Sequence, residues 1–226
     1  MKRTQVQEVM TTTVVTAGES MPYRHLAGLL YAKGIGAVPV VDPERRVLGV
    51  VSGADLAVKA ADALAVPATA RLDSPRRRRE RRKAGARTAG ELMTAPAVTV
   101  TPEATIGQAA RIMRRQRVGR LPVTDPGTGR LAGIVTRSDL LRVYLRPGEE
   151  IRAEIEAEVL RRVPGADPSW LTVTVRDGVV TISGQVEQKS AVSGLRAIAL
   201  QIEGVIQVDQ DITYVLDDRY PSSPLL

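Results

Sequence analysis

The sequence contains no cysteine and no phenylalanine, and it has only one histidine and one tryptophan. The absence of cysteine excludes disulfides, thiolate-bound metals and a cysteine nucleophile. The single histidine, His25, has no acidic or histidine neighbour at ligand spacing. The sequence therefore offers few of the residues that histidine-based catalysis or zinc binding requires. We therefore expect His25 to lie at the surface or in packing contacts, and we expect no metal site.

Long apolar runs are also missing. No stretch reaches the about 18 apolar residues of a membrane-spanning helix, and the basic N-terminal start is not followed by the apolar part of a signal peptide. We therefore expect a cytoplasmic protein, with contact at the periphery of a membrane as a further option.

Apolar residues nevertheless make up 43% of the 226 residues, and most of them are valine, alanine, leucine and isoleucine. Cores of this kind favour strands mixed with helices of small residues. Domains usually have about 100–200 residues, so the length predicts more than one hydrophobic core.

The positive charge is concentrated in one segment. Residues 71–87 hold nine basic and two acidic residues, which accounts for the whole net charge of +7. Like charges repel, so we interpret the segment as a solvated linker. Contact with an anionic membrane or with nucleic-acid phosphate is the alternative. Aromatic residues do not alternate with the arginines, which argues against nucleic acid as a partner.

The chain contains an internal repeat. The two copies match at an offset of 83 residues, which becomes 84 after a proline-containing turn where the second copy is one residue longer. An insertion at such a turn is what a hairpin loop tolerates. The matching segments are 9–11 with 92–94, 35–40 with 118–123, and 49–52 with 133–136. Repetition of this length indicates two copies of one structural unit.

Each copy has the same predicted order of elements. Apolar residues at helical spacing begin at Tyr23 in the first copy and at Ile106 in the second. Two short strands and a helix that opens near Asp55 or Asp139 follow. The predicted strands are 37–41 and 47–52 in the first copy, and 120–124 and 131–136 in the second. The unit is β-α-β-β-α, which places the chain in the α+β, or mixed α/β, class.

This unit resembles the CBS motif, named after cystathionine β-synthase. The residues that carry the resemblance are 9–10, 38–42 and 49–56 in the first copy, and 92–93, 121–125 and 133–140 in the second. The resemblance implies that the two repeats form one disc-like module, commonly a homodimer. We assign residues 1–60 to the first repeat, 61–87 to an arginine-rich linker and 88–146 to the second repeat.

The pattern changes to α-β-β-α-β over residues 147–216, with a two-residue hairpin turn at Asp177-Gly178. This region resembles a BON domain in residues 173–184 and 202–208. The resemblance implies contact with an anionic phospholipid surface or with a protein partner. We interpret Trp170 as a core or edge residue, or as an interfacial anchor. Residues 217–226 form a C-terminal tail.

The CBS resemblance also implies two nucleotide clefts, each marked by a serine or threonine with an aspartate three residues later. A carboxylate accepts hydrogen bonds from ribose hydroxyls, and the start of a helix suits a phosphate. Adenine is expected against the apolar backbone of the central strands. The candidate residues are Ser52, Asp55, Thr136, Asp139, Arg137, Arg120, Val38, Pro39, Leu121 and Pro122. The alternative is that the polar residues merely cap helices.

The two copies differ in charge at this point. Arg120 and Arg137 stand where the first copy has Ala37 and Gly53. Arginine binds phosphate through two hydrogen bonds, so we expect the second cleft to hold a phosphorylated ligand more tightly.

The sequence predicts a non-enzymatic regulatory protein that requires no cofactor. It would bind AMP, ADP, ATP or another adenosyl compound between the repeats, while the BON domain contacts a membrane or a protein partner. The alternative is a constitutive adaptor that uses the basic linker and the BON domain, with non-functional clefts. An enzyme ranks third, because no Ser/His/Asp set, paired carboxylates or metal ligands are evident.

Overall fold

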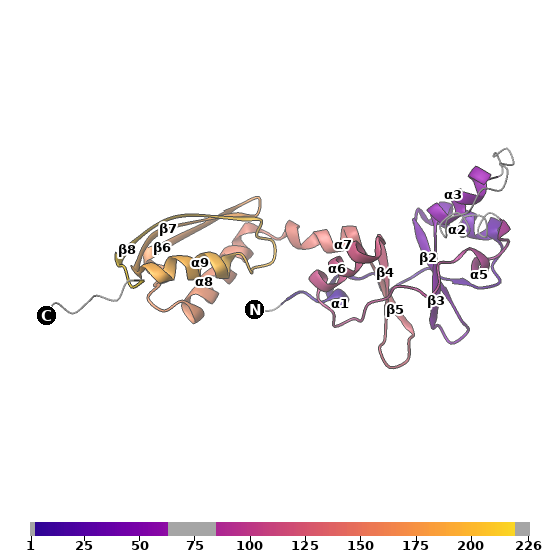
Figure 1. Ribbon diagram of the computed structural model, residues 1–226, viewed down its shortest axis with the longest axis horizontal. Coiled ribbons are helices and arrows are strands. Elements are labelled where there is room, and N and C mark those ends of the chain that lie inside the picture. The colour runs from indigo at the N-terminus through magenta and orange to yellow at the C-terminus, as the bar shows by residue number, and fades with distance from the viewer. Residues whose placement is uncertain (1–2, 63–84, 220–226) are drawn as a thin grey trace. The chain divides into compact units, whose positions relative to one another are not determined.

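The computed structural model describes residues 3–62 and 85–219 (Figure 1). The chain divides into two compact units, Gln5–Asp139 and Leu140–Leu226, the second of which includes Met1–Thr4. The expected mixture of helices and sheets is confirmed. Most of the predicted linker, and the predicted tail beyond residue 219, lie outside the described residues.

The first repeat forms a three-stranded sheet with order β1-β2-β3. Strand β1 is parallel to β2, and β2 is antiparallel to β3, with Ala37 opposite Ser52. The strands predicted at 37–41 and 47–52 are present with the predicted bounds. The elements are α1 (Val6–Val9), β1 (Ala17–Gly18), α2 (Tyr23–Lys33), β2 (Ala37–Val41), β3 (Val47–Ser52) and α3 (Gly53–Asp62).

The second repeat has the same plan. Strands β4 and β5 are antiparallel with Arg120 opposite Thr136, and a parallel bridge from Val100 to Val123 takes the place of the first strand. Thr105 and Gln108 form a capping box at the start of α6. The elements are α5 (Ala89–Leu92), α6 (Ile106–Gln116), β4 (Arg120–Thr124), β5 (Leu131–Thr136), α7 (Arg137–Leu141) and a 3₁₀ helix η1 (Arg142–Leu145).

The short leading helix of each repeat packs on the other repeat. In α1, the Val6 N–H donates to the Ala104 carbonyl at 2.8 Å, and Val6 is completely buried. In α5, the Ala89 N–H donates to the Met21 carbonyl at 2.9 Å, and Leu92 belongs to the same hydrophobic cluster as Leu26. The two repeats are therefore joined into one unit by exchanged helices.

Two glycines allow the repeats to approach closely. A Cβ atom at Gly49 would lie 2.6 Å from the Met93 Sδ and 2.9 Å from the Thr94 carbonyl oxygen. The related Gly133 would meet the Met10 Sδ at 2.6 Å. At both places a backbone from the other repeat lies against the second strand of the hairpin, so a side chain has no room.

The remaining unit contains a three-stranded sheet with order β6-β7-β8. Strands β6 and β7 form the predicted hairpin, in which Asp177 and Gly178 have φ angles of 49° and 77°. Strand β8 is parallel to β7. The elements are α8 (Gly148–Arg162), a 3₁₀ helix η2 (Pro168–Trp170), β6 (Leu171–Arg176), β7 (Val179–Gln188), α9 (Lys189–Ala199) and β8 (Gln207–Leu216).

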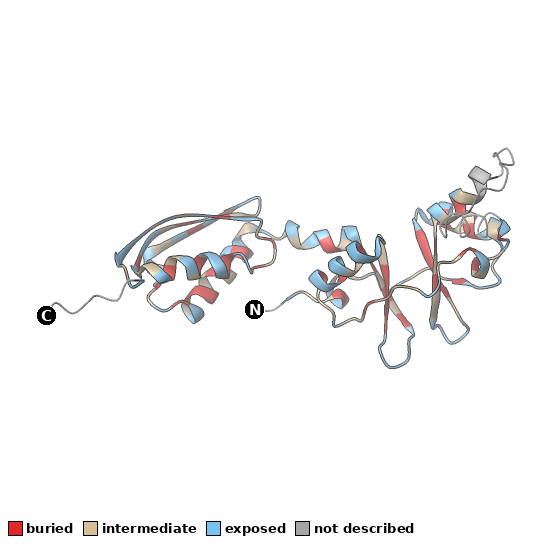
Figure 2. Ribbon diagram, viewed as in Figure 1, coloured by how far each residue is buried: buried red, intermediate tan, exposed pale blue. Residues whose placement is uncertain are grey.

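Helices α8 and α9 pack on this sheet and form a separate core (Figure 2). Ile155 from α8, Leu195 from α9 and Ile182 from β7 are completely buried there. Trp170 is 55% exposed, so the interpretation that it belongs to the core is wrong. It lies in a 3₁₀ turn directly before β6 and is not part of the buried apolar cluster.

Candidate functional site

The polar pair of the first repeat lies where β3 turns into α3. The Asp55 Oδ2 accepts hydrogen bonds from the Ser52 N–H at 2.8 Å and from the Ser52 hydroxyl at 2.7 Å. In return, the Ser52 Oγ accepts from the Asp55 N–H at 3.4 Å. This reciprocal pattern is a helix cap, and it fixes the positions of both side chains.

The second repeat reproduces the arrangement. The Asp139 Oδ2 accepts from the Thr136 N–H at 2.8 Å and from the Thr136 hydroxyl at 2.7 Å. The Asp139 N–H is 3.4 Å from the Thr136 Oγ1. The structure therefore confirms helix capping in both copies, and capping by itself does not decide whether a ligand binds.

A cavity adjoins the pair of the first repeat. Its volume is about 250 Å³, and Ser52 and Asp55 form part of its wall. Residues of the second repeat form the facing wall, so both repeats are needed to build the cavity. The lining residues are Ala37, Val50, Ser52, Asp55, Thr94, Ala97, Val98, Arg117, Val118, Gly119 and Arg120.

Arg120 brings a positive charge into this cavity. Its Nη2 would lie 2.6 Å from a Cβ atom at position 36, so Gly36 provides the room that the guanidinium occupies. Burial lowers the pKa of Arg120 below its ordinary value, although arginine remains charged at neutral pH. Among the described residues, no carboxylate forms an ion pair with Arg120. The arrangement can bind an anionic group.

The other predicted site residues lie elsewhere. Val38 and Leu121 are completely buried in the core. Pro39 and Pro122, which directly follow them in the sequence, are buried too. None of these four residues lines the cavity. Arg137 donates from its Nη2 to the Val118 carbonyl at 3.3 Å.

The structure also corrects the assignment of Arg120 to the second cleft. Arg120 lines the cavity beside Ser52 and Asp55 of the first repeat. The reason is that the Ser52–Asp55 pair shares its cavity with residues of the second repeat, whereas the sequence-based assignment grouped residues repeat by repeat.

The described part of the chain was also compared with the expectations for His25, a metal site and a membrane-spanning helix. His25 is exposed, and no group of three or more His, Asp or Glu residues there could hold a metal ion. None of the described helices is both long enough and apolar enough to cross a membrane.

Comparison with known families agrees with the two repeats and the separate C-terminal unit. The CBS domain family matches residues 6–62 and 89–146, and the BON domain family matches residues 148–215. The chain belongs to the CBS domain family and carries a BON domain. Together the matches cover most of the sequence, and the cavity lies within the CBS pair.

Similar proteins share mainly the CBS pair. An uncharacterized protein of Methanopyrus kandleri is 26% identical over 143 residues, which cover 63% of this chain and 64% of that protein. The chain thus spans less than two thirds of that relative's length. The crystal structure of CBSX2 in complex with AMP is 27% identical, with a TM-score of 0.53, and covers 62% of this chain and 96% of that one.

A second solved structure is similar to the CBS pair, and this similarity concerns only the fold. It is the CBS domain pair of protein MJ0100 in complex with 5′-methylthioadenosine and S-adenosyl-L-methionine, at 22% identity and a TM-score of 0.51. It covers 63% of this chain and 97% of that one.

Sequence reasoning missed Arg117, which lines the CBS cavity together with Arg120. Alignment of the two repeats could have indicated Arg117. At the offset of 83, Arg117 and Arg120 correspond to Gly34 and Ala37, so the second copy carries two additional positive charges at related positions.

Proposed function

We propose that this chain is a regulatory protein that binds a phosphorylated adenosine, AMP, ADP or ATP, between its CBS repeats. The ligand occupies the cavity beside Ser52 and Asp55. One observation carries the proposal: this cavity combines a fixed hydroxyl–carboxylate pair from one repeat with Arg117 and Arg120 from the other. No catalytic step and no cofactor are part of the proposal.

Each part of the ligand has a chemically suitable wall. The Asp55 carboxylate accepts hydrogen bonds from the ribose hydroxyls, which requires no additional proton. The guanidinium of Arg120 binds the phosphate, and Arg117 adds a second positive charge. Adenine packs against the apolar side chains of Val98 and Val118. The crystallised complex of CBSX2 with AMP supports this choice of ligand class.

We also propose a second cleft at Thr136 and Asp139, with a different ligand preference. Its polar pair has the same hydrogen bonds as the first, but Gly34 and Ala37 stand at the positions related to the two arginines. A cleft without those charges favours an adenosyl compound without phosphate, with Arg137 as its own cation. This order of preference is the reverse of the sequence-based expectation.

The test is calorimetric titration of AMP and adenosine into the full chain. We expect Arg120→Gln to weaken AMP binding by about tenfold or more, because a hydrogen bond to a charged group contributes about 1.5–3 kcal/mol. Adenosine binding should change little in this variant. Asp55→Ala should weaken both ligands, because both carry the ribose hydroxyls.

Asp139→Ala is the matched control, because it removes the same carboxylate from the other cleft. The tight AMP site should persist in this variant. Equal losses of AMP affinity in Asp55→Ala and Asp139→Ala, or unchanged affinity in Arg120→Gln, would contradict the proposed site.

The proposed regulation extends to the BON domain and to a homodimer of the CBS pair. A ligand regulates only if it binds one conformation better than another. Sedimentation with anionic liposomes, with and without AMP, separates a sensor from a constitutive adaptor. A sensor changes its liposome binding when AMP is added, and an adaptor does not. Analytical ultracentrifugation of the full chain tests the homodimer.

A further inference from the structure

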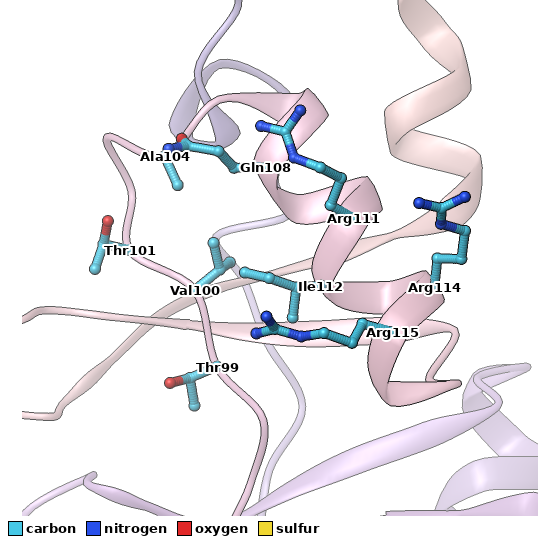
Figure 3. A pocket seen from close by; sticks show the side chains of 9 residues that line it. All are labelled: Thr99, Val100, Thr101, Ala104, Gln108, Arg111, Ile112, Arg114 and Arg115. Atoms are coloured by element: carbon cyan, nitrogen blue, oxygen red, sulfur yellow. The ribbon is translucent and has the colours of Figure 1, made fainter.

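A larger cavity lies on the second repeat and shares no lining residue with the proposed AMP cleft (Figure 3). Its volume is about 720 Å³, and it lies between helix α6 and the segment that leads into that helix. Val100 and Ile112 provide apolar surface in the middle of the group (Figure 3). The lining residues are Thr99, Val100, Thr101, Ala104, Gln108, Arg111, Ile112, Arg114 and Arg115.

Two arginines of this cavity lie on one face of α6. Arg111 and Arg115 are four residues apart, which places them one above the other on a helix. Figure 3 shows the Arg115 side chain extending past Ile112 to the side where Thr99 lies, while the Arg111 guanidinium lies near Gln108. Both guanidinium groups therefore border the same hollow.

These charges are not neutralised within the described part of the protein. No carboxylate there forms an ion pair with Arg111 or Arg115. The acidic residue of the adjacent segment, Glu103, is not among the lining residues. Like charges four residues apart on a helix are destabilising, so the charges of this pair do not stabilise the helix.

The cavity also offers neutral hydrogen-bond donors. The Gln108 Oε1 accepts from the Thr105 N–H at 2.8 Å, and this bond orients the amide so that its NH₂ group is left as a donor. Thr99 and Thr101 line the cavity from the segment opposite α6, and their hydroxyls point away from that helix in Figure 3. Arginines together with a neutral amide donor suit an anion with several oxygen atoms.

The first repeat shows that the CBS fold does not need these groups. At the offset of 83, Gly28 and Ala32 correspond to Arg111 and Arg115, and Gly18 corresponds to Thr101. Helix α2, which carries Gly28 and Ala32, has the same length as α6. The positive charge is thus a specific property of the second repeat.

We propose that this cavity binds a ligand that carries a phosphate monoester or pyrophosphate group, independently of the AMP cleft. Arg111 and Arg115 bind the phosphate oxygens, because a guanidinium matches a phosphate with paired N–H donors. The NH₂ group of Gln108 donates a further hydrogen bond. Val100 and Ile112 contact an apolar part of the ligand.

The first experiment is calorimetric titration of the full chain with sodium pyrophosphate. All proteins in this experiment carry glutamine in place of the seven basic residues at 76–79 and 81–83, so that this segment contributes no binding. The test variant is Arg111→Gln with Arg115→Gln. The matched control is Arg24→Gln with Lys33→Gln, which removes two exposed charges from α2, the related helix of the first repeat.

We expect the test variant to lose pyrophosphate affinity by about tenfold or more, and the control to keep it. An equal loss in the control would overturn the proposal, because it would show attraction by net charge alone. Loss only in Arg120→Gln would also overturn it, because pyrophosphate would then occupy the AMP cleft. If pyrophosphate does not bind at all, and vesicles that contain phosphatidic acid do not bind either, the proposal is also wrong.

The second experiment separates a soluble ligand from a lipid headgroup. The same proteins are sedimented with phosphatidylcholine vesicles that contain phosphatidic acid, and with vesicles of phosphatidylcholine alone. Binding to phosphatidic acid that is lost in the test variant supports the proposal with a lipid as the source of the phosphate. Pyrophosphate binding without vesicle binding supports it with a soluble ligand. If the test variant behaves like the control with both probes, the proposal is wrong.

Discussion

Gly49 lies where the backbones of the two CBS repeats approach each other. The neighbouring Val50 exchanges backbone hydrogen bonds with Thr94 of the other repeat at 3.1 and 2.9 Å. These bonds hold the Thr94 carbonyl in place, and a Cβ atom at Gly49 would lie 2.9 Å from its oxygen. A methyl group at this position must therefore displace backbone as well as the flexible Met93 side chain.

We predict that Gly49→Ala destabilises the CBS pair by about 1–3 kcal/mol, the usual cost of overpacking a filled site. Urea unfolding of the full chain, followed by circular dichroism, measures this change. Gly28→Ala on α2 is the control, because a Cβ atom there would meet nothing within 4 Å. Alanine should raise helix stability at that position. Equal midpoints for the two variants would contradict the prediction.

Residue-level prediction from the sequence succeeded for local chemistry and failed for partners across the cleft. The spacing of Ser52 and Asp55 is local, so the cap could be inferred without a structure. The position of Arg120 beside them depends on how the two repeats face each other, and the repeat alignment carries no information about that arrangement.

At the level of elements, the exchanged helix α5 completes the core of the first repeat. Leu92 is completely buried in a cluster that contains Leu26, Val38 and Val51. Leucine-to-alanine changes at such sites remove contacts and leave a cavity. The effect of a change in α5 should therefore appear in the strands of the other repeat.

We predict that Leu92→Ala destabilises the protein by about 2–5 kcal/mol. Hydrogen–deuterium exchange followed by mass spectrometry should show faster exchange in β2 and β3 before it shows any in β4 and β5. Leu145→Ala is the control, because Leu145 is 80% exposed. Faster exchange mainly in β4 and β5 would show that α5 stabilises its own repeat.

The packing of α1 and α5 on the opposite repeats could not be predicted from the sequence. The periodicity of apolar residues located all four hairpin strands of the CBS pair, because that pattern is local. It did not predict the short leading helices α1 and α5, so it gave no sign that each packs on the opposite repeat. In the BON domain, α9 ends at Ala199, and Ile202 is buried just beyond it.

An ion pair connects two elements of the BON domain. The Lys189 Nζ at the start of α9 lies 2.5 Å from the Asp217 Oδ2, directly after β8. The hydrogen bond from Lys189 holds the pKa of Asp217 below its ordinary value. The hydrogen bond to Asp217 and one with Tyr214 raise the pKa of Lys189.

These directions predict how stability depends on pH. The contribution of Asp217 is fully present above the aspartate pKa of the unfolded chain, about 4, and is lost as the pH falls through the lower folded value. The raised pKa of Lys189 acts at the other end, where stability is lost only as the pH rises through the folded value. We therefore predict that Asp217→Asn destabilises the BON domain at pH 7 and that the difference from the unchanged protein shrinks at acid pH.

Urea unfolding at a series of pH values tests this prediction. Asp211→Asn, on the same strand, is the control, because Asp211 forms no ion pair among the described residues. A difference between Asp217→Asn and the unchanged protein that is constant from pH 7 to strongly acid pH would contradict the assigned role of the ion pair.

At the level of the whole molecule, the CBS pair and the BON domain have separate hydrophobic cores. One cluster contains residues from Ala17 to Leu92, and the other contains residues from Ile151 to Val208. The proposed AMP cleft belongs entirely to the first unit, Gln5–Asp139. Ligand binding and BON stability should therefore respond to different mutations.

Leu195 allows this independence to be tested, because it is completely buried in the BON core. We predict that Leu195→Ala destabilises the BON domain by about 2–5 kcal/mol and leaves the AMP affinity unchanged. AMP at 100 times its Kd should stabilise the CBS pair, the unit that binds it, by about 2.7 kcal/mol and leave the stability of the BON domain unchanged. Scanning calorimetry with and without AMP measures both effects. If the transition lowered by Leu195→Ala is the one that AMP raises, the two units share one folding equilibrium, and the separate cores do not act separately.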